Sequence, residues 1–436
     1  MHCLMFSFMS LRCSKRDKKK GEQKIVKMHQ TMPLQMKDGT FRNPWPTFEE
    51  RTLLHVVKWK ARAPFAAPKF PSAQQAAVLL PTTPMLDWDT IRVNMVLPSQ
   101  KLMGCGCDLE KGMHATWLGH STFLLNVGGW TILTDPVFCY RASPCQYVGP
   151  ARMVPVPISL RNLPRIDVVT ISHNHYDHLD SNAVEELIQL FHPIFVVPLK
   201  MGVWFSKIRG VDMDRVREVG WYSPVDVASL VSTLGTRFQK RERESSNSSS
   251  IPGIVSVSGD LDSKNHEKIM TNNKRCIEKS KVLRVTGVPA QHWSMRTGLD
   301  RYFELWCGFI LETDKYRMYH AGDTGYCDVF KEIGSNFAPI DFAMIPIGAY
   351  SPRDFMRPQH VDPTEAVQIH VDIGAKKSVG MHWGTFILTD EPVDEPPKLL
   401  AAARQPKGVT AADFRTLMHG ETMSICCRCS STTATT

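Results

Sequence analysis

The sequence predicts an α/β fold in which buried strands alternate with amphipathic helices. Residues 166–173, "IDVVTISH", form a continuous apolar run typical of a strand buried on both faces. The following segment, 181–191, has the apolar spacing of a helix with one buried side, and 193–199 is a second apolar strand. A strand, loop, helix and strand in this order indicate a layered sheet, and the carboxyl ends of strands are where such folds place their sites.

A hairpin is predicted ahead of this unit. Residues 116–127 and 130–134 are rich in β-branched and aromatic side chains, and Gly128-Gly129 joins the two runs. Two glycines at this place favour a two-residue turn, because both central positions of the usual hairpin turn need a positive φ.

More strands are predicted within residues 281–293, 305–313, 316–324 and 341–350. A helix then begins after Asp362, which can cap it, with Pro363 in its first position and Glu365 in its third. A last strand is expected within residues 377–386, before a proline-rich stretch.

The composition is that of a globular protein: 43% of the 436 residues are apolar and 22% are charged. The net charge of +9 is concentrated in residues 14–24, which form either a solvated tail or a segment attracted to an anionic surface. Residues 1–9 are apolar but too short to span a bilayer, and they lack a basic n-region, so we do not expect a secretory signal. We therefore expect a soluble or peripherally membrane-bound protein whose twelve cysteines are mostly reduced.

Three regions are expected along the chain. Residues 1–110 have little periodic pattern and should be irregular and partly disordered. Residues 111–425 should form one ordered domain, interrupted at about 235–281 by a flexible, serine-rich insertion. Residues 426–436 should be a disordered tail.

The segment "SHNHYDHLD" concentrates metal-binding side chains directly after a predicted strand. His173, His175, Asp177 and His178 lie within six residues, and imidazole with carboxylate is a donor set that suits Zn²⁺. Neighbouring residues start from opposite directions, so all four cannot readily bind one tetrahedral ion. Two ions a few Å apart would relieve that strain, one held by the first two histidines and one by Asp177 and His178.

Ligands from elsewhere must then complete both sites. His292, Asp323 and His382 are candidates, because each follows a predicted strand and so lies at a comparable place in a layered fold. Asp135, in "LTDPVF", is better suited to accept a hydrogen bond from a ligand imidazole than to bind metal itself. His120 and His320 are expected in supporting or core positions.

These motifs resemble those of the metallo-β-lactamase superfamily, with its H-x-H-x-D-H cluster, lone His, G-D-T Asp and late His. Other segments are similar to the family of phospholipases D that hydrolyse N-acylphosphatidylethanolamine. They are "FRNPWPT", "TWLGHST", "TDPVF", "RASPCQYVGP", "QHW", "AGDTGYC", "IPIGAYSPRDFM", "QHVDPTEAV" and "HWGTF". The resemblance extends over most of residues 41–386 and leaves out the serine-rich insertion and both tails.

The resemblance implies an αββα sandwich of two mixed sheets flanked by helices, and two zinc ions. The implied ligands are His173, His175 and His292 for one ion, Asp177, His178 and His382 for the other, and Asp323 as a bridge. The ion pair would supply hydroxide at neutral pH for attack on a phosphodiester, releasing an N-acylethanolamine and phosphatidic acid.

Further roles follow from the same resemblance. Asp177, Asp323 and His360 are implied as catalytic residues, and His360 would also contact the substrate phosphate and assist proton transfer to the leaving alkoxide. Tyr176 is a second implied substrate contact, and Gln146 and Tyr147 are weaker candidates. For a lone Tyr or Gln, packing or structural hydrogen bonding is an equally good interpretation.

The resemblance implies a peripheral membrane enzyme on endomembranes, such as Golgi or endosome, with a cytosolic pool. It also implies a homodimer, and we expect no binding of nucleic acid. Two alternatives stay open: a soluble hydrolase of the same fold that cuts a lactone or a nucleic-acid phosphodiester, and a zinc-stabilised scaffold without turnover. The basic charge does not favour a nuclease, because it lies in the tail and the insertion rather than near the metal motifs.

Overall fold

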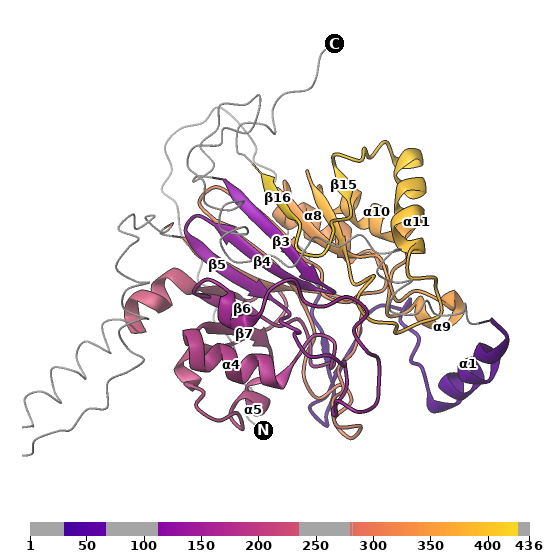
Figure 1. The fold of residues 1–436 in the computed structure, drawn as a ribbon, viewed down its shortest axis with the longest axis horizontal. Coiled ribbons are helices and arrows are strands. Elements are labelled where there is room, and N and C mark those ends of the chain that lie inside the picture. The colour runs from indigo at the N-terminus through magenta and orange to yellow at the C-terminus, as the bar shows by residue number, and fades with distance from the viewer. Residues whose placement is uncertain (1–29, 67–111, 235–279, 281, 426–436) are drawn as a thin grey trace, which may run out of the picture.

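Two seven-stranded mixed sheets pack face to face with helices on both outer sides (Figure 1). This computed structural model describes residues 30–66, 112–234, 280 and 282–425. The predicted αββα arrangement is confirmed. The predicted insertion at 235–281 and the tail at 426–436 lie almost entirely outside the described residues, so the expected division into regions stays a prediction there.

The first sheet has the strand order β16-β3-β4-β5-β6-β7-β8. Its first three contacts, from β16 to β5, are antiparallel, and those from β5 to β8 are parallel. Its strands are β3 (Met113–Gly119), β4 (Thr122–Val127), β5 (Trp130–Thr134), β6 (Val168–Thr170), β7 (Ile194–Pro198), β8 (Val216–Val219) and β16 (Thr422–Ile425).

The second sheet has the order β15-β14-β13-β12-β11-β10-β9, with parallel pairs from β15 to β12 and antiparallel pairs beyond. Its strands are β9 (Pro224–Asp226), β10 (Leu283–Val288), β11 (Gly308–Thr313), β12 (Arg317–His320), β13 (Phe342–Pro346), β14 (Ser378–Met381) and β15 (Phe414–Arg415).

Helices cover the outer faces of both sheets. In Figure 1, α4 and α5 lie beside the first sheet, and α8, α10 and α11 lie beside the second. No helix among the described residues is long and apolar enough to cross a membrane. The helices are α1 (Leu53–Ala66), α4 (Ser181–Phe191), α5 (Gly202–Phe205), α8 (Val329–Phe337), α9 (Arg353–Met356), α10 (Pro363–Asp372) and α11 (Glu395–Arg404), with 3₁₀ turns at Leu160–Asn162, Met213–Arg215 and Gln405–Lys407.

Alternation along the strands builds two cores. Val168 of β6 joins the large core between the sheets, whereas the next residue, Val169, packs with Val184 and Leu187 of α4. Successive strand side chains point to opposite faces, so a strand apolar at every position is buried on both. The continuous apolar run of residues 166–173 is explained in this way.

The predicted helix starts and hairpin are confirmed. The Asp362 side chain accepts a hydrogen bond from Glu365 N at the start of α10, and Asp180 caps α4 in the same manner. Val127 pairs with Trp130 across the turn Gly128-Gly129, in which both glycines have a positive φ.

Two boundaries were predicted wrongly. Residues 116–127 form not one strand but parts of β3 and β4, which turn sharply at His120, where φ is 53°. The strand ending at Met381 is not the last, because β16 returns to pair with β3. A strand of four residues such as β16 is too short for its pattern to predict it, since its place is decided by pairing with a distant strand.

The N-terminal region is more regular than predicted. Within 30–66 the chain forms β1 (Leu34–Gln35), β2 (Phe41–Arg42) and α1, where the sequence led us to expect irregular structure. Long-range contacts order it: Phe41 N donates to Tyr302 O, and the Phe41 side chain is buried in the core. Such contacts leave no periodic pattern in the sequence.

Candidate metal centre

The histidine cluster forms the turn between β6 and α4. The backbone N–H groups of His178 and Leu179 both donate to His175 O, which folds residues 173–178 into a tight bend at the carboxyl end of β6. Asp180 then begins α4. The predicted placement of the cluster after a buried strand is therefore confirmed.

Three imidazoles converge on one point. His175 Nδ1 lies 2.9 Å from His173 Nε2 and 3.3 Å from His292 Nε2. His292 Nδ1–H donates to Gln359 O, which leaves His292 Nε2 with a lone pair. We refer to His173, His175 and His292 as half-site 1.

Ser172 decides the proton position of His173. Its hydroxyl donates to Asp135 Oδ2 and lies 2.9 Å from His173 Nδ1, so it accepts from that nitrogen. His173 Nε2 consequently also carries a lone pair that faces His175 Nδ1. One proton cannot serve both contacts of His175, whereas a divalent cation can be bound by all three nitrogens.

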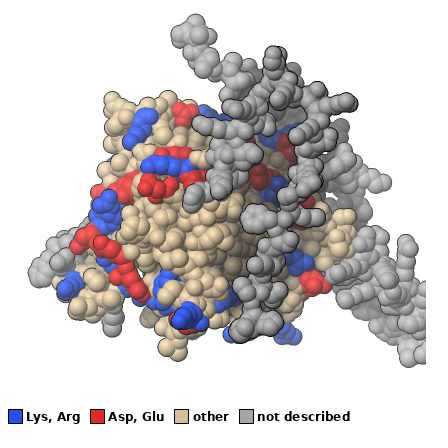
Figure 2. Space-filling model, turned by 180° about the vertical axis from the view of Figure 1, so that it is seen from behind, with Lys and Arg blue, Asp and Glu red and all other residues tan. Residues whose placement is uncertain are grey.

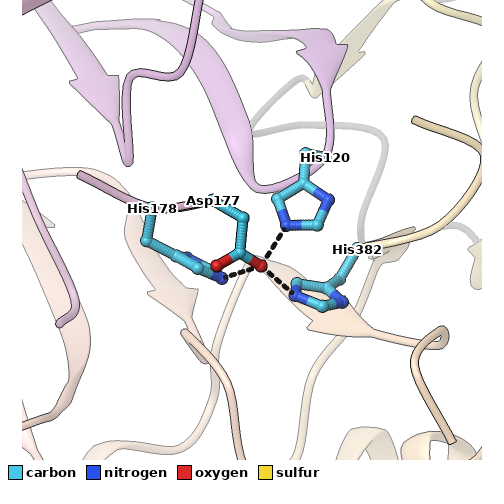
Figure 3. Close-up of side chains that lie close together, drawn as sticks. All are labelled: His120, Asp177, His178 and His382. Atoms are coloured by element: carbon cyan, nitrogen blue, oxygen red, sulfur yellow. Dashed lines mark hydrogen bonds and ion pairs between the residues drawn. The ribbon is translucent and has the colours of Figure 1, made fainter. Parts of the chain in front are cut away.

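A second group gathers around Asp177 Oδ2 (Figure 3). His120 Nε2 lies 2.9 Å from this oxygen, His382 Nε2 3.3 Å and His178 Nε2 3.5 Å. These residues come from the β3–β4 turn, the end of β14 and the β6–α4 turn. We refer to Asp177, His178 and His382 as half-site 2.

Asp323 lies between the two half-sites. Its Oδ2 is 3.1 Å from His382 Nε2 and 3.2 Å from His178 Nε2, and within 3.9 Å of the Nε2 atoms of His173 and His292. Its Oδ1 is buried without a hydrogen-bond partner. A carboxylate in this position fits a bridge between two cations.

Asp135 supports the centre as predicted. Its Oδ2 accepts from His178 Nδ1 at 2.7 Å, and its Oδ1 accepts from Ser172 N. This fixes Nδ1 of His178 as the donor to Asp135, so that Nε2 is the ring nitrogen that faces half-site 2. His320 lies apart from both half-sites, with Nε2 close to Ser121 O.

The backbone is strained around the centre. His120, Asp135 and His382 have φ values of 53°, 35° and 62°, a region that non-glycine residues rarely occupy. Gly322 lets the Asp323 turn approach the first sheet, since a Cβ there would lie 2.8 Å from Ser172 Cβ. Strain of this kind clusters at functional sites.

The two half-sites differ in protonation. Burial lowers the pKa of His175 to about 3 and that of His292 to about 4, and it also holds the pKa of His173 well below its usual value. Burial opposes protonation in half-site 2 as well, but the carboxylates of Asp323 and Asp177 raise the pKa of His382 to about 9. Half-site 1 is thus ready for a cation at neutral pH, whereas half-site 2 holds protons.

Metal binding should therefore depend on pH through half-site 2. A cation must displace the protons of His178 and His382, so we expect its affinity to rise as the pH increases toward about 9. Binding at half-site 1 should change little between pH 6 and 8. Calorimetric titration of metal-free protein in buffers of different ionisation enthalpy should show release of about two protons in one binding phase only. Equal proton release in both phases would contradict this assignment.

His360 lies over both half-sites. Its Nδ1 is 3.9 Å from Asp323 Oδ2, and its ring centre is 5.2 Å from that of His292 and 5.4 Å from that of His382. Nδ1 is buried without a partner, and burial holds the pKa of His360 well below its usual value. A neutral imidazole pointing at the centre can donate to, or accept a proton from, a group bound there.

Of the other three predicted substrate contacts, Tyr176 and Gln146 are engaged elsewhere. The Tyr176 hydroxyl donates to Arg296 O, and the Arg296 guanidinium covers its ring. The Gln146 side chain closes its own loop on the backbone N and O of Arg141. Tyr147 is 91% exposed. Substrate contact by these three residues stays a prediction.

Sequence reasoning missed a buried carboxylate that braces the cluster. Glu304 accepts from the side-chain amide of Asn174, whose Oδ1 accepts from Met295 N. Asn174 lies between two ligand candidates, so this pair holds the loop in place. The signal available in the sequence was a lone glutamate in the apolar stretch "YFELWCG". Burial of a charged carboxylate costs free energy, so a glutamate at such a place indicates a specific partner.

Glu304 should make the stability depend on pH. Burial raises its pKa from 4.5 to about 7, so the folded protein keeps a proton that the unfolded chain loses. The contribution of this proton to the free energy of unfolding is fully present below about pH 4.5. It is lost as the pH rises to about 7, which lowers the free energy of unfolding by about 3 kcal/mol in total. We expect Glu304→Gln, measured by urea unfolding across this range, to remove that loss. The exposed Glu49→Gln should leave it unchanged.

Comparisons with known proteins identify the family of this chain. The profile of the Beta-lactamase superfamily domain matches residues 130–255 and 255–383. An N-acyl-phosphatidylethanolamine-hydrolyzing phospholipase D from Caenorhabditis elegans is 33% identical over 76% of this chain and 80% of its own length. The chain belongs to this phospholipase D family of the beta-lactamase superfamily.

Two further proteins are similar to this chain. A mitochondrial N-acyl-phosphatidylethanolamine-hydrolyzing phospholipase D from Saccharomyces cerevisiae is 30% identical over 66% of this chain and 51% of its own length. The solved structure of a metallo hydrolase from Ignicoccus hospitalis has 20% identity and a TM-score of 0.45, covering 72% of this chain and 98% of that one.

Family membership confirms the predicted fold class and a metal-dependent phosphodiester hydrolase. The clustered His and Asp side chains fit a divalent metal. The structure brings all seven predicted ligands and His360 together, and their individual roles stay predictions.

Proposed function

We propose that this protein is a zinc-dependent phospholipase D that hydrolyses N-acylphosphatidylethanolamine to an N-acylethanolamine and phosphatidic acid. The observation that carries the proposal is the position of Asp323 Oδ2, within 4 Å of imidazole nitrogens from both half-sites. The substrate class is that of the worm and yeast relatives, which are N-acyl-phosphatidylethanolamine-hydrolyzing phospholipases D.

The donor set supports two zinc ions. Half-site 1 offers three imidazoles, half-site 2 offers two imidazoles and a carboxylate, and Asp323 would complete both. A zinc pair supplies an activated water at neutral pH and neutralises charge on phosphate oxygens. The chain's own residues orient the ligands through Asp135, Ser172 and Gln359.

His360 is the protein group proposed to act on the substrate. With Nδ1 free and directed at the centre, its neutral imidazole is placed to bind a phosphate oxygen and to relay the proton released by the attacking water to the departing ethanolamine oxygen. Asp177 and Asp323 are proposed to act by holding the ions, and no side-chain nucleophile is required.

A phospholipid substrate implies contact with a bilayer surface. We therefore propose that the protein associates peripherally with endomembranes, Golgi or endosome, and has a cytosolic pool. From the family resemblance we also propose that it works as a homodimer. The face drawn in Figure 2 shows Lys and Arg interspersed with Asp and Glu over the described residues, rather than one broad basic area. Mixed charge of this kind does not favour binding of nucleic acid on this face.

One assay tests the substrate. Metal-loaded protein is incubated separately with vesicles containing N-acylphosphatidylethanolamine, with a lactone and with single-stranded DNA. We expect release of N-acylethanolamine and phosphatidic acid from the vesicles alone. Turnover of the lactone or DNA without lipid hydrolysis would replace the proposed substrate, and no turnover of any of the three by zinc-loaded protein would contradict the proposal.

A further inference from the structure

The motif "FRNPWPT" supplies no ligand to the centre, yet part of it touches half-site 1. Residues 43–47, "NPWPT", form a segment that we call the strap. Asn43 Nδ2 donates to the backbone oxygen of His292 at 2.7 Å, and the Thr47 hydroxyl donates to Gln291 Oε1. Both contacts join residues about 250 positions apart in the chain.

The strap is built to donate through its side chains. Pro44 and Pro46 have no backbone N–H and restrict φ of the chain to near −65°. The residue before each proline is also held in an extended conformation. The amide of Asn43 and the hydroxyl of Thr47 are therefore presented in fixed positions by a segment with few conformations to lose.

Both ends of the contact are anchored. Trp45 stacks on the buried Trp221 with ring centres 5.4 Å apart, and the Phe41 side chain lies in the core. On the other side, the Gln291 side chain is fully buried and donates through Nε2 to Pro358 O. The strap thus rests on the packed interior and not on a mobile loop.

His292 is held from three directions. Its Nδ1 donates to Gln359 O, Gln291 exchanges hydrogen bonds with Thr324 and Gly325, and the strap supplies the donor to His292 O. The hydrogen bond from the strap differs from the other two supports, because the strap precedes the two sheets in the chain and is not one of their connections. Removing it would leave two acceptors, His292 O and Gln291 Oε1, without their donors.

We propose that the strap is a positioning element for half-site 1, in which Asn43 and Thr47 hold the His292 imidazole in the geometry needed to retain a metal ion. Neither residue touches the ion or the substrate. The inference rests on the metal assignment of the proposed function and not on its lipid substrate. Groups that orient metal ligands typically change metal affinity by about 10- to 100-fold when they are removed.

Full-length protein loaded with Co²⁺ provides the test. A His382→Ala background restricts the probe ion to half-site 1, and loss of the Co²⁺ absorbance after addition of a chelator reports its dissociation rate. We expect dissociation about tenfold faster in Asn43→Leu and in Thr47→Val, and a rate close to that of the background in Thr47→Ser, which keeps the hydroxyl.

Thr31→Val is the matched control. Thr31 belongs to the same N-terminal arm, but its hydroxyl donates to Glu332 on α8, away from the centre. Its Co²⁺ dissociation should equal that of the background. Unchanged dissociation in both strap variants would overturn the inference, and so would equal acceleration by Thr31→Val.

Folding and function are read separately. Thermal unfolding of each variant shows whether the fold is kept. If Thr47→Val does not fold, the Co²⁺ dissociation rates of Asn43→Leu and Thr47→Ser still show whether the strap positions half-site 1 or has no effect on it. Failure of the unsubstituted, zinc-loaded protein to release N-acylethanolamine would overturn the proposed function, while the Co²⁺ dissociation rates would still test the strap.

Discussion

Asp323→Asn is expected to lower the rate of phosphodiester hydrolysis by about a thousandfold or more. The substitution keeps the shape of the side chain but removes the negative charge that lies 3.1 Å from His382 Nε2 and 3.2 Å from His178 Nε2. Loss of a shared carboxylate ligand should cost several kcal/mol of transition-state stabilisation, and about 1.4 kcal/mol corresponds to a tenfold change in rate. Steady-state kinetics together with metal content per chain measure the effect.

Asp341→Asn is the matched control for this substitution. Asp341 precedes β13 in the same sheet, but its carboxylate pairs with Lys376 and accepts from Arg317 N, remote from the described half-sites. We expect its rate and metal content to be unchanged. Full activity and two metal ions per chain in Asp323→Asn would contradict the bridging role.

His360→Gln is expected to lower kcat by about 100- to 1000-fold while leaving the metal content unchanged. The imidazole Nδ1 lies 3.9 Å from Asp323 Oδ2 and has no hydrogen-bond partner, so it is free to act on a bound phosphodiester. General acid–base groups typically contribute factors of this size. The pH profile of kcat in the variant should lack the change in rate that titration of the imidazole causes in the unsubstituted protein.

Metal analysis separates two interpretations of His360. It also lies close to His292 and Asp323 in a group that could hold an ion. Loss of one metal ion in His360→Gln would make it a ligand and would contradict the proton-transfer role. His192→Asn, at the exposed left-handed end of α4, is the control and should keep both rate and metal content.

Local patterns were enough for the parts of the fold that depend on neighbouring residues. The helix starts at Asp180 and Asp362, the Gly128-Gly129 turn and the doubly buried strand β6 follow from side chains a few positions apart. The strand boundary at His120 and the return of β16 to β3 do not, because a bulge and a distant pairing decide them. Local propensity carries no information on such contacts.

The donor chemistry of the centre follows from the sequence in the same way. A cluster of three histidines and an aspartate after an apolar strand indicates a metal site by residue type and spacing alone. His292, Asp323 and His382 could be proposed because each follows a strand, and the carboxyl ends of strands in one layered fold meet along one edge.

What the sequence by itself determined is therefore the class of site: which side chains can bind a cation, and in which loops they lie. Only the tertiary structure decided which nitrogen of each imidazole faces the centre, through Ser172, Asp135 and Gln359, and that Glu304 and the strap hold the loops. The physical reason is that hydrogen-bond direction and burial depend mostly on groups that are distant in the chain: Asp135 is 43 positions from His178, and Asn43 is 249 positions from His292. Such groups become neighbours only when both sheets have packed together.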